Sequence, residues 1–309
     1  AELWNSFEYF SGYGFNKSHA VSYSILSFQC AWLLNYYPAE WMAAFLDKEP
    51  EHKKEKAIGI AKSLGFKTEP LNINTSGKVW EISDDGKTLI QPLTSIKGLG
   101  DSAMDQILMN RPFNTIEEFL FHKEVTYSKL NKKALDVLCR SGAMKSLQDD
   151  RFTGAKHFWS CVAVDRPRKE ANLLDNIETY ADEGDFSTEE RIQYLTDLTG
   201  MFPINLVMKG DTLSQLVDNG IPAISEYDKK LKMVWFITRK VTIKKTKNDK
   251  SYYVLEVIDD NNVITTIRCW GVNLLKDRIQ LNRPYIAKID YNDQWGFSTR
   301  SMYHNFRPL

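Results

Sequence analysis

Residues 10–20 read FSGYGFNKSHA, and this run is the most informative stretch of the chain. Its two glycines allow tight turns with positive φ angles. Hydrogen-bond donors and positive charge then gather at the predicted start of a helix, and N–H groups at a helix start beside a cation are suited to binding a triphosphate. A glycine turn into a core helix with an ordinary surface histidine is the alternative interpretation. The clustered residues are Asn16, Lys17, Ser18 and His19.

The residues that follow favour the triphosphate interpretation. Residues 29–33 read QCAWL and residues 36–44 read YYPAEWMAA. Together with the run from residue 10, they resemble the end of the fingers domain in the C-family replicative DNA polymerases, the bacterial DNA polymerase III α subunits. The resemblance implies that Lys17 and His19, with Asn16 and Ser18 beside them, bind the triphosphate of an incoming dNTP.

A second motif lies at residues 96–103, which read IKGLGDSA. It looks like a helix-hairpin-helix hairpin, in which a Gly-x-Gly turn presents backbone N–H groups to a DNA phosphate. A tight turn between two packed helices, without a ligand, would produce the same pattern. The C-family resemblance continues here and at residues 130–143, and it implies a hairpin that grips the backbone of duplex DNA. The expected duplex contacts are Lys97, Gly98, Leu99, Gly100 and Ser102.

The hydrophobic pattern changes its period to two after residue 229, which predicts strands. Three alternating segments, a helix over residues 272–280 and two further alternating segments predict a five-stranded OB-type barrel. Two of the separators are rich in Asn, Asp and Lys, as is typical of turns. The predicted strands are residues 234–244, 251–258, 263–270, 284–292 and 294–300.

The first part of this predicted barrel is strongly basic. Residues 229–250 hold nine Lys or Arg residues and one acid, although the net charge of the whole chain is zero. Cations interleaved with aromatic rings are typical of single-stranded nucleic-acid binding, and the C-family resemblance implies an OB domain at this place. A solvated hairpin whose aromatic residues point into the barrel is the alternative. The expected single-strand contacts are Arg239, Lys240, Lys244, Lys245, Lys247 and Tyr252.

The chain as a whole is expected to be a multidomain α+β protein. Helical patterns cover residues 53–64, 101–142 and 188–198, and Ser187 or Thr188 is the predicted N-cap of the last. Residues 165–188 are acidic and weakly patterned, which predicts a loop with at most one short helix. The expected domains are the end of the fingers (1–47), a helix-hairpin-helix domain (48–150), a linker with a helical segment (151–228) and the OB-type barrel (229–309).

A short peptide that binds a sliding clamp lies between hairpin domain and barrel in C-family members. It usually begins with Gln and ends with bulky apolar residues. The best local match has Glu where Gln is usual and Leu where Phe is usual, and the resemblance implies that it contacts a clamp. This match comprises Glu170, Ala171, Asn172, Leu173 and Leu174.

Composition limits the remaining function classes. A hydrophobic fraction of 43% and a charged fraction of 26% are typical of a soluble globular protein. No run approaches ~18 apolar residues, so we expect no membrane partner. The four cysteines show no paired spacing, which predicts reduced side chains, no zinc site and a cytoplasmic location. The first residues contain neither a methionine nor a signal peptide, so we expect a piece of a longer protein.

We therefore predict the fingers end, duplex-binding domain and OB domain of a replicative DNA polymerase, a nucleotidyltransferase of bacterial or phage-infected cells. In the C-family the catalytic palm aspartates precede the fingers, and no stretch here matches them. No catalytic or metal-binding residue is therefore assigned, and the chain alone is expected to be inactive. The resemblance implies that palm residues outside the chain hold Mg²⁺. Its implied partners are template-primer DNA, an incoming dNTP, the upstream palm and thumb, and a sliding clamp.

A non-enzymatic DNA-binding accessory protein, built from a hairpin module and an OB barrel, is the rival prediction. It explains Gly98, Gly100 and the basic barrel equally well. It offers no reason for the pattern at residues 14–19, and this pattern favours the polymerase.

Overall fold

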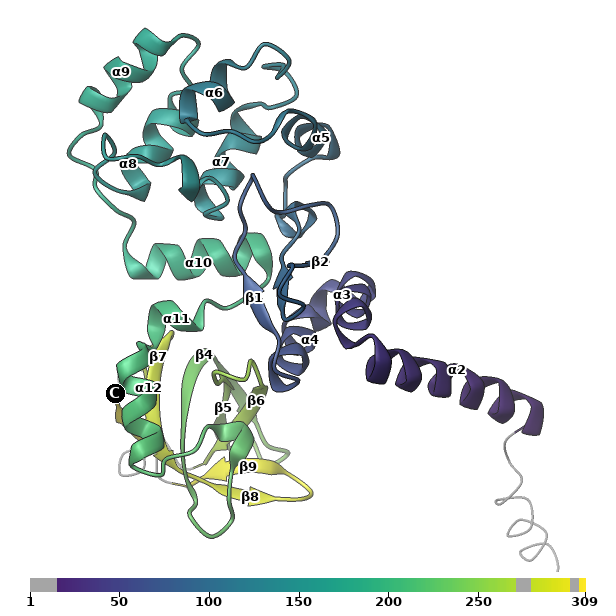
Figure 1. Cartoon of the computed structure of the whole chain (residues 1–309). Coiled ribbons are helices and arrows are strands. Elements are labelled where there is room, and N and C mark those ends of the chain that lie inside the picture. The colour runs from purple at the N-terminus through teal and green to yellow at the C-terminus, as the bar shows by residue number, and fades with distance from the viewer. Residues whose placement is uncertain (1–15, 271–278, 301–305) are drawn as a thin grey trace, which may run out of the picture.

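The computed structural model describes residues 16–270, 279–300 and 306–309. Figure 1 shows a helical unit, a curled sheet below it, and a long helix, α2, that extends away from both. The helices are α2 (Lys17–Tyr36), α3 (Pro38–Lys48), α4 (Glu51–Ser63), η1 (Leu93–Ser95), α5 (Asp101–Asn110), α6 (Ile116–Phe121), α7 (Lys132–Arg140), η2 (Lys145–Leu147), α8 (Ala155–Trp159), the π-helix η3 (Ser160–Val164), α9 (Glu170–Thr179), α10 (Thr188–Thr199), α11 (Ile204–Val207), α12 (Gly210–Asp218) and η4 (Ile224–Glu226). The strands are β1 (Lys67–Glu69), β2 (Glu81–Ile82), β3 (Thr88–Ile90), β4 (Met233–Lys245), β5 (Ser251–Ile258), β6 (Ile264–Cys269), β7 (Arg283–Lys288), β8 (Asp290–Asn292), β9 (Gly296–Thr299) and β10 (Phe306–Pro308).

Helix α3 anchors the N-terminal part of the described chain. Pro38 starts it directly after α2, because proline lacks the N–H that a first helical residue does not use. Its buried residues recur every three or four positions, so one face packs against α4 and the small sheet β1-β3-β2. The buried residues of α3 are Ala39, Met42, Ala43 and Leu46.

The helical unit has one hydrophobic core that reaches from Leu71 to Leu198. Side chains of α5, α6 and α7 form its centre, and Phe113 meets Phe119 edge to face with ring centroids 5.0 Å apart. Phe158 of α8, Cys161 of η3 and other apolar side chains from residues 155–173 pack into the same core. The segment after residue 150 is therefore an integral part of the helical unit.

The large sheet has the topology of an OB fold. Its strand order is β10-β7-β4-β5-β6-β9-β8, and all neighbours are antiparallel except β6 and β9. Only Ile289 separates β7 from β8, so these two strands form one bent strand that pairs with β4 and with β9. The sheet therefore curls back on itself around an apolar core to which Val234, Phe236 and Leu255 belong.

Strand β4 is buried on both of its faces near its start. Phe236 points into the barrel, whereas Trp235 and Ile237 pack outward against a second cluster. This outer cluster contains Phe202 and Leu216 from the segments that include α11 and α12. Burial on both faces explains why the sequence is continuously apolar here instead of alternating.

A buried ion pair connects the curled sheet to α4. Glu55 Oε2 lies 2.6 Å from Arg239 Nη1, and the two side chains are only 10% and 15% exposed. Glu55 Oε1 also accepts a hydrogen bond from the N–H of Phe202 at 3.0 Å. Close by, a Cβ on Gly59 would lie 2.5 Å from the Asn261 carbonyl oxygen, so only glycine lets α4 approach the β5–β6 turn this closely.

The α+β prediction with a hairpin domain and an OB-type sheet is confirmed. The predicted strands correspond to β4, β5, β6, the bent β7–β8 pair and β9, and β10 is an addition. The predicted helix over residues 272–280 lies almost entirely outside the described residues. Ser187 is the N-cap of α10 and forms a capping box with Glu190, as the sequence indicates.

The weakly patterned region 165–188 contains one helix of ten residues, α9, and the rest of it is loop up to the start of α10. The sequence of α9 is acidic, and only Leu173 and Asn176 are buried. Too few apolar positions face the core for the sequence to show a helical period. Helices α8, α11 and α12 were also not expected. The first two span five and four residues, and short helices carry little periodic signal.

We expect Arg239→Met to lower the free energy of unfolding by about 3 kcal/mol, because Glu55 would remain as a buried, unpaired charge. Adding Glu55→Gln should recover most of the loss, since glutamine can still accept the Phe202 N–H. Urea-induced unfolding measures both changes. Lys245→Met is the control, because its ion pair with Asp249 is exposed and should contribute little. A harmless single Arg239→Met change would contradict the assignment.

Candidate nucleic-acid interface

The hairpin at residues 96–102 is shaped by one residue of positive φ and one buried side chain. Gly98 has φ +89°, a conformation that side chains with a Cβ rarely adopt. Leu99 is 8% exposed and belongs to the core of the helical unit, and its N–H donates to the Ile96 carbonyl oxygen at 3.2 Å. Leu99 therefore anchors the turn, and its amide is not available to a phosphate in this conformation.

Three amides beside this turn remain open. The N–H groups of Gly100, Asp101 and Ser102 find no acceptor among the residues that the structure describes, because they belong to the first turn of α5. Gly100 has an ordinary φ of −81°, and a Cβ there would meet no atom within 4 Å. Gly100 is the N-cap of α5, a position where glycine is common, and its open surroundings also leave room for a close approach from outside.

Two lysines lie next to the turn at Gly98. Lys97 is exposed, and its backbone N–H donates to the Leu198 carbonyl oxygen of α10 at 2.8 Å. Lys133, in the first turn of α7, has its Cε atom 3.7 Å from the position that a Cβ on Gly98 would occupy. Lys97, Gly98, Gly100 and Ser102 are close neighbours in the chain. The structure adds Lys133, which lies 35 residues after Gly98 and has no signal in the hairpin motif.

The outer face of the curled sheet carries a second group of aromatic and basic side chains. Lys244 on β4 pairs in register with Tyr252 on β5, and the rings of Tyr252 and Trp270 stack with centroids 4.4 Å apart and planes 20° from parallel. In the next outward row Val254 pairs with Arg268 on β6. This face thus combines a stacked aromatic pair with cations.

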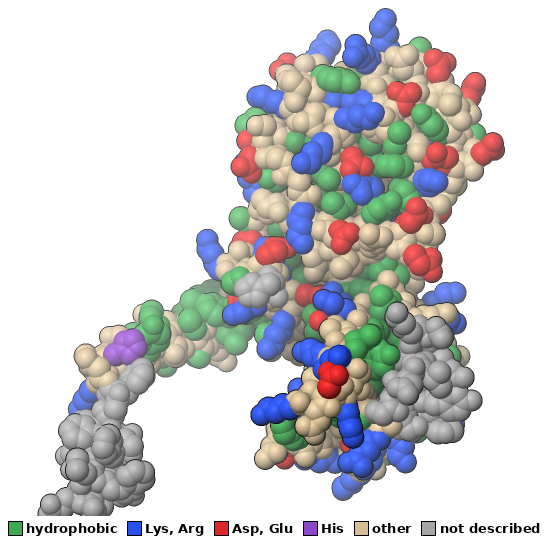
Figure 2. Space-filling model, turned by 180° about the vertical axis from the view of Figure 1, so that it is seen from behind, with side chains coloured by type: hydrophobic (Ala, Val, Ile, Leu, Met, Phe, Trp, Pro, Cys, Tyr) green, Lys and Arg blue, Asp and Glu red, His purple; other side chains and the backbone are tan. Residues whose placement is uncertain are grey.

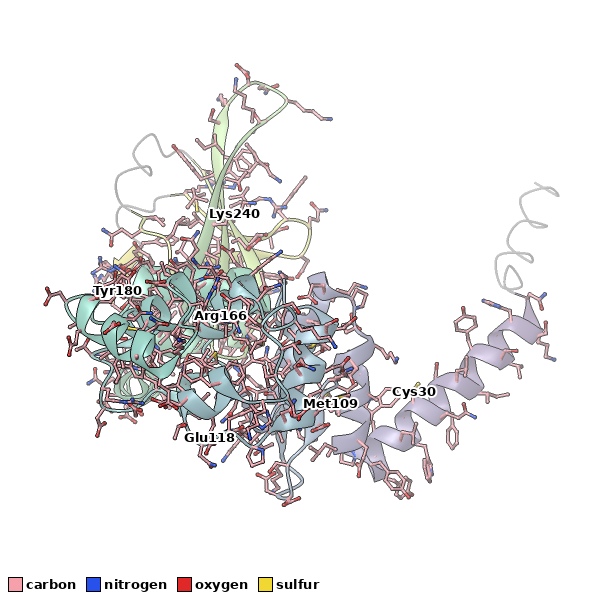
Figure 3. All side chains as sticks on the ribbon, turned by 90° about the horizontal axis from the view of Figure 1, so that it is seen from above. Cys30, Met109, Glu118, Arg166, Tyr180 and Lys240 are labelled. Atoms are coloured by element: carbon pink, nitrogen blue, oxygen red, sulfur yellow. The ribbon has the colours of Figure 1, made fainter. Side chains whose placement is uncertain are left out.

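Lysines extend this surface along the β4–β5 hairpin. Lys240, Lys244 and Lys247 are exposed and have no carboxylate partner among the described residues, whereas Lys245 pairs with Asp249 at 2.8 Å. Figure 3 labels Lys240 on this hairpin, which projects beyond the helices. Figure 2 shows Lys and Arg side chains gathering over the curled-sheet part of the face that it draws.

Arg239 does not belong to this surface. Its guanidinium is held by Glu55 at the contact with α4 and lies 5.4 Å from the centroid of the Phe202 ring. The register between β4 and β5 is irregular at Arg239. The grouping of Arg239 with the exposed lysines is therefore corrected, because the Glu55 carboxylate and the Phe202 ring cover its guanidinium.

Three residues of this face were not predicted. Trp270 continues the outward alternation of Tyr252 across the strand pair, and Arg268 lies two positions before it. Trp295, in the turn between β8 and β9, is 63% exposed, and its carbonyl oxygen accepts a hydrogen bond from Arg268. The alternation of side chains along the strand could have indicated Trp270. Only the parallel pairing of β6 with β9 brings Trp295 next to Arg268.

The predicted triphosphate residues lie at the start of α2. Asn16 is the N-cap, and its Oδ1 atom accepts from the N–H of Ser18 at 3.0 Å and from its hydroxyl at 2.6 Å. Lys17 and His19 are exposed on the first turn, and the His19 ring lies 4.4 Å from the Tyr23 ring. The four residues are therefore adjacent, while the glycine turn before them lies outside the described residues.

The segment considered for clamp binding forms the first turns of α9. Leu173 is 1% exposed within the core of the helical unit, whereas Leu174 is 54% exposed. Of the two leucines, a partner could reach only Leu174 unless this helix unwound. The structure therefore separates the two apolar residues that a clamp-binding peptide would use together.

The described residues contain no group of three or more His, Cys, Asp or Glu side chains placed to hold a metal ion. All four cysteines are free thiols, and burial raises the pKa of Cys161 and Cys269 to about 12. Within the same described ranges, no helix has the length and apolar character needed to span a membrane. The surfaces described above offer backbone amides, cations and aromatic rings.

Comparison with known proteins agrees with this description. Residues 65–154 match the helix-hairpin-helix motif family, a range that includes the Gly98–Gly100 turn and α5 to α7. The chain is 37% identical over 157 residues to the DNA polymerase III subunit alpha of Xylella fastidiosa, which covers 48% of the chain and 13% of that protein. The same protein of Thermus aquaticus is 36% identical over 154 residues, covering 48% and 12%.

A longer match reaches through the curled sheet. The DNA polymerase III subunit alpha of Vibrio cholerae is 26% identical over 279 residues, which covers 89% of the chain and 24% of that protein. The chain thus spans between 12% and 24% of the length of these three relatives. With its helix-hairpin-helix domain followed by an OB-type sheet, the chain is similar to the bacterial DNA polymerase III α subunits, and this similarity is consistent with a C-terminal portion of such a subunit.

Proposed function

We propose that this chain holds template-primer DNA for a replicative DNA polymerase whose nucleotidyl transfer takes place on palm residues outside it. The open amides of Gly100, Asp101 and Ser102, with Lys97 and Lys133 next to the same turn, are the observation that carries this proposal. They form a phosphate-binding helix start inside the range that matches the helix-hairpin-helix family. Because amides contact phosphates and not base edges, the binding is to duplex backbone without sequence preference.

The outer face of the curled sheet supports a second part of this function, the binding of single-stranded template. Tyr252 and Trp270 provide a stacking platform, and Lys240, Lys244 and Lys247 provide cations beside it. Bases of a single strand expose their rings to such a platform, whereas bases of a duplex do not. The hairpin thus holds duplex and the sheet holds the unpaired strand.

Helix α2 favours the polymerase over the stand-alone accessory protein. None of its 20 residues is buried among the described residues, and large apolar side chains such as Ile25, Leu26 and Phe28 are more than half exposed. A monomeric protein rarely leaves so many neighbouring apolar side chains in water. We infer that other portions of the polymerase cover α2, and that its first turn, with Lys17 and His19, faces an incoming dNTP whose Mg²⁺ is held by palm residues.

We expect Gly100→Ala to weaken duplex binding about tenfold, because a methyl group would hold the phosphate away from hydrogen bonds worth ~1.5 kcal/mol or more. The fold should tolerate the change, since a Cβ at this position meets no neighbour. Anisotropy of a labelled duplex at fixed salt measures the affinity. Gly210→Ala is the matched control, because it also lies at a helix start with open space around it. Equal duplex affinity in both folded variants would show the turn to be structural only.

Replacing Lys240, Lys244 and Lys247 together by Gln should reduce the salt dependence of single-strand binding. Each lost phosphate contact lowers the log–log slope by about 0.7, so a change of roughly 2 is expected. Trp270→Ala should instead cost about 1–3 kcal/mol of affinity at an unchanged slope. Titration of a labelled oligonucleotide over a salt series separates the two effects. Lys288→Gln, on β7 and two strands from β5, is the control; an effect as large as that of the triple variant would argue against a specific face.

In the complete polymerase, Lys17→Ala should raise the apparent KM for dNTP by about tenfold, the loss expected for a charge-assisted contact to phosphate. Affinity for template-primer DNA should stay within experimental error. Steady-state incorporation on a primed template measures the first quantity, and filter binding measures the second. Lys48→Ala on α3 is the control. Unchanged nucleotide kinetics with weakened DNA binding would assign Lys17 to the DNA.

A further inference from the structure

Arg166 is a buried arginine for which the described residues provide no carboxylate. The residue is 8% exposed, and none of the ion pairs in the described part of the chain includes it. Its Nη1 atom donates to the Tyr127 carbonyl oxygen at 3.0 Å, and its guanidinium carbon lies 3.5 Å from the centroid of the Tyr127 ring. Its Nε atom is buried and has no hydrogen-bond partner. Burial lowers the pKa of this guanidinium from its ordinary value.

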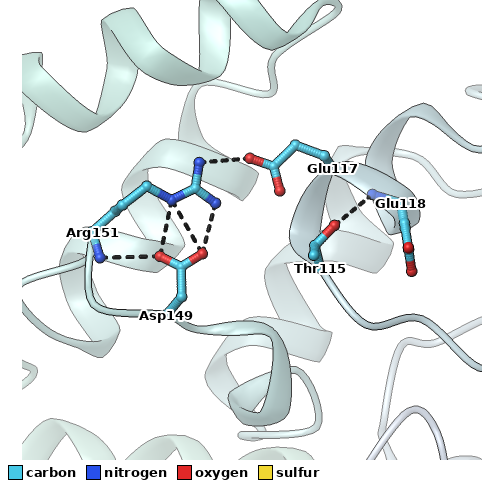
Figure 4. A network of polar contacts seen from close by, with 5 residues as sticks. All are labelled: Thr115, Glu117, Glu118, Asp149 and Arg151. Carbon is cyan, nitrogen blue, oxygen red and sulfur yellow. Dashed lines mark hydrogen bonds and ion pairs between the residues drawn. The ribbon is translucent and has the colours of Figure 1, made fainter.

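Arg166 differs from the paired arginines of the helical unit by being buried without a carboxylate. Figure 4 shows a paired, more exposed arginine: the Arg151 guanidinium lies 2.6 Å from oxygen atoms of both Asp149 and Glu117. Buried arginines are almost always paired in this way, since an unpaired charge loses its hydration without compensation. At Arg166 a backbone carbonyl and a ring face are the only compensation provided, and neither carries a negative charge. The site is therefore complementary to one anionic group.

An apolar hollow adjoins this arginine. It has a volume of about 350 Å³ and is lined by Leu120, Phe121, Tyr127, Pro167 and Arg168. Tyr127 joins the two features, because one Arg166 contact is to its ring and Arg168 lies 5.8 Å from the centroid of the same ring. Figure 3 labels Arg166 in the view of the helical unit from above. Arg168 thus borders a surface made mainly of apolar and aromatic side chains, and Arg166 adjoins it through the Tyr127 ring.

The neighbourhood selects against a long polyanion. A second hollow shares Phe121 and is lined by four carboxylates together with Lys123 and His122, so a nucleic-acid backbone that continued past Phe121 would meet an excess of negative charge. The apolar side chains of Leu120 and Pro167 also offer a phosphate chain no hydrogen bond or charge. A ligand with one negative charge and bulky apolar groups satisfies both features. The four carboxylates belong to Glu117, Glu118, Glu124 and Glu170.

We propose that Arg166, Arg168 and the adjoining hollow form a peptide-docking site on the helical unit. Its occupant is a partner protein's segment in which one carboxylate lies between bulky apolar side chains. The carboxylate pairs with the guanidinium groups, and the apolar side chains fill the hollow beside Tyr127. This site is separate from the hairpin and the curled sheet, so it does not depend on the proposed DNA binding.

Fluorescence anisotropy with the full chain tests the proposal directly. The probe is a fluorescein-labelled peptide with the sequence Gly-Ser-Leu-Asp-Leu-Phe and an amidated C-terminus, so that it carries one carboxylate. We expect it to bind about tenfold or more tightly than the same peptide with Asn in place of Asp, or with Ala in place of Leu and Phe. An unlabelled DNA duplex should not displace it. Equal binding of the Asp and Asn peptides, or displacement by duplex, overturns the proposal.

Variants separate a docking role from a structural one. Arg166→Met keeps the length of the side chain and removes its buried charge, so we expect it to raise the thermal unfolding midpoint while peptide binding is lost. Arg168→Met, at an exposed position, should leave the midpoint unchanged and weaken binding. Arg140→Met is the matched control: it removes an arginine paired with Asp136, so it should lower the midpoint and leave peptide affinity unchanged. A lowered midpoint in Arg166→Met, with peptide affinity kept in Arg168→Met, would show that Arg166 only supports the fold.

Discussion

The relative placement of the helical unit and the curled sheet depends on the buried contact between Glu55 and Arg239. Glu55 joins three segments at once, because one carboxylate oxygen meets Arg239 on β4 and the other accepts the N–H of Phe202. The chain before Phe202 leads back to Leu198, whose carbonyl oxygen accepts the N–H of Lys97 in the hairpin. Two hydrogen bonds and one ion pair, joined by residues 198–202 of the chain, therefore connect the hairpin to β4. Such a pair is costly to bury unless both charges are satisfied, and here they are.

This connection fixes the hairpin and the curled sheet, which carry the two candidate surfaces, on one framework. The open amides at Gly100 suit a duplex phosphate, whereas the stacked rings of Tyr252 and Trp270 suit unpaired bases. A polymerase needs both, because its template is paired behind the growing primer end and single-stranded ahead of it. Holding the two surfaces on one framework lets the position of the duplex define where the single strand lies. Under the proposed function, the exposed apolar side chains of α2 offer a separate attachment to the rest of the polymerase.

Much of the architecture was predictable because the local signals were strong. The alternating segments after residue 233 became β4 to β9, and Ser187 with Glu190 formed the capping box that their spacing indicates. Short or weakly periodic segments were not predictable. Helix α9 buries only two of its ten residues, and the π-helix η3 has no distinctive sequence pattern. Residues 155–179 therefore looked like linker, although they complete the core of the helical unit.

The sequence by itself determined the turn at Gly98 to Gly100, the succession of strands along the chain and the basic hairpin. Each of these depends on neighbouring residues or on a fixed side-chain period. Only the tertiary structure decided which charges remain open. Arg239 and Lys240 are adjacent, yet the contact with α4 pairs the first with Glu55 and leaves the second in solvent. Leu173 and Leu174 divide in the same way between core and surface. Pairing and burial depend on residues far away in the chain, and a local pattern holds no information about them.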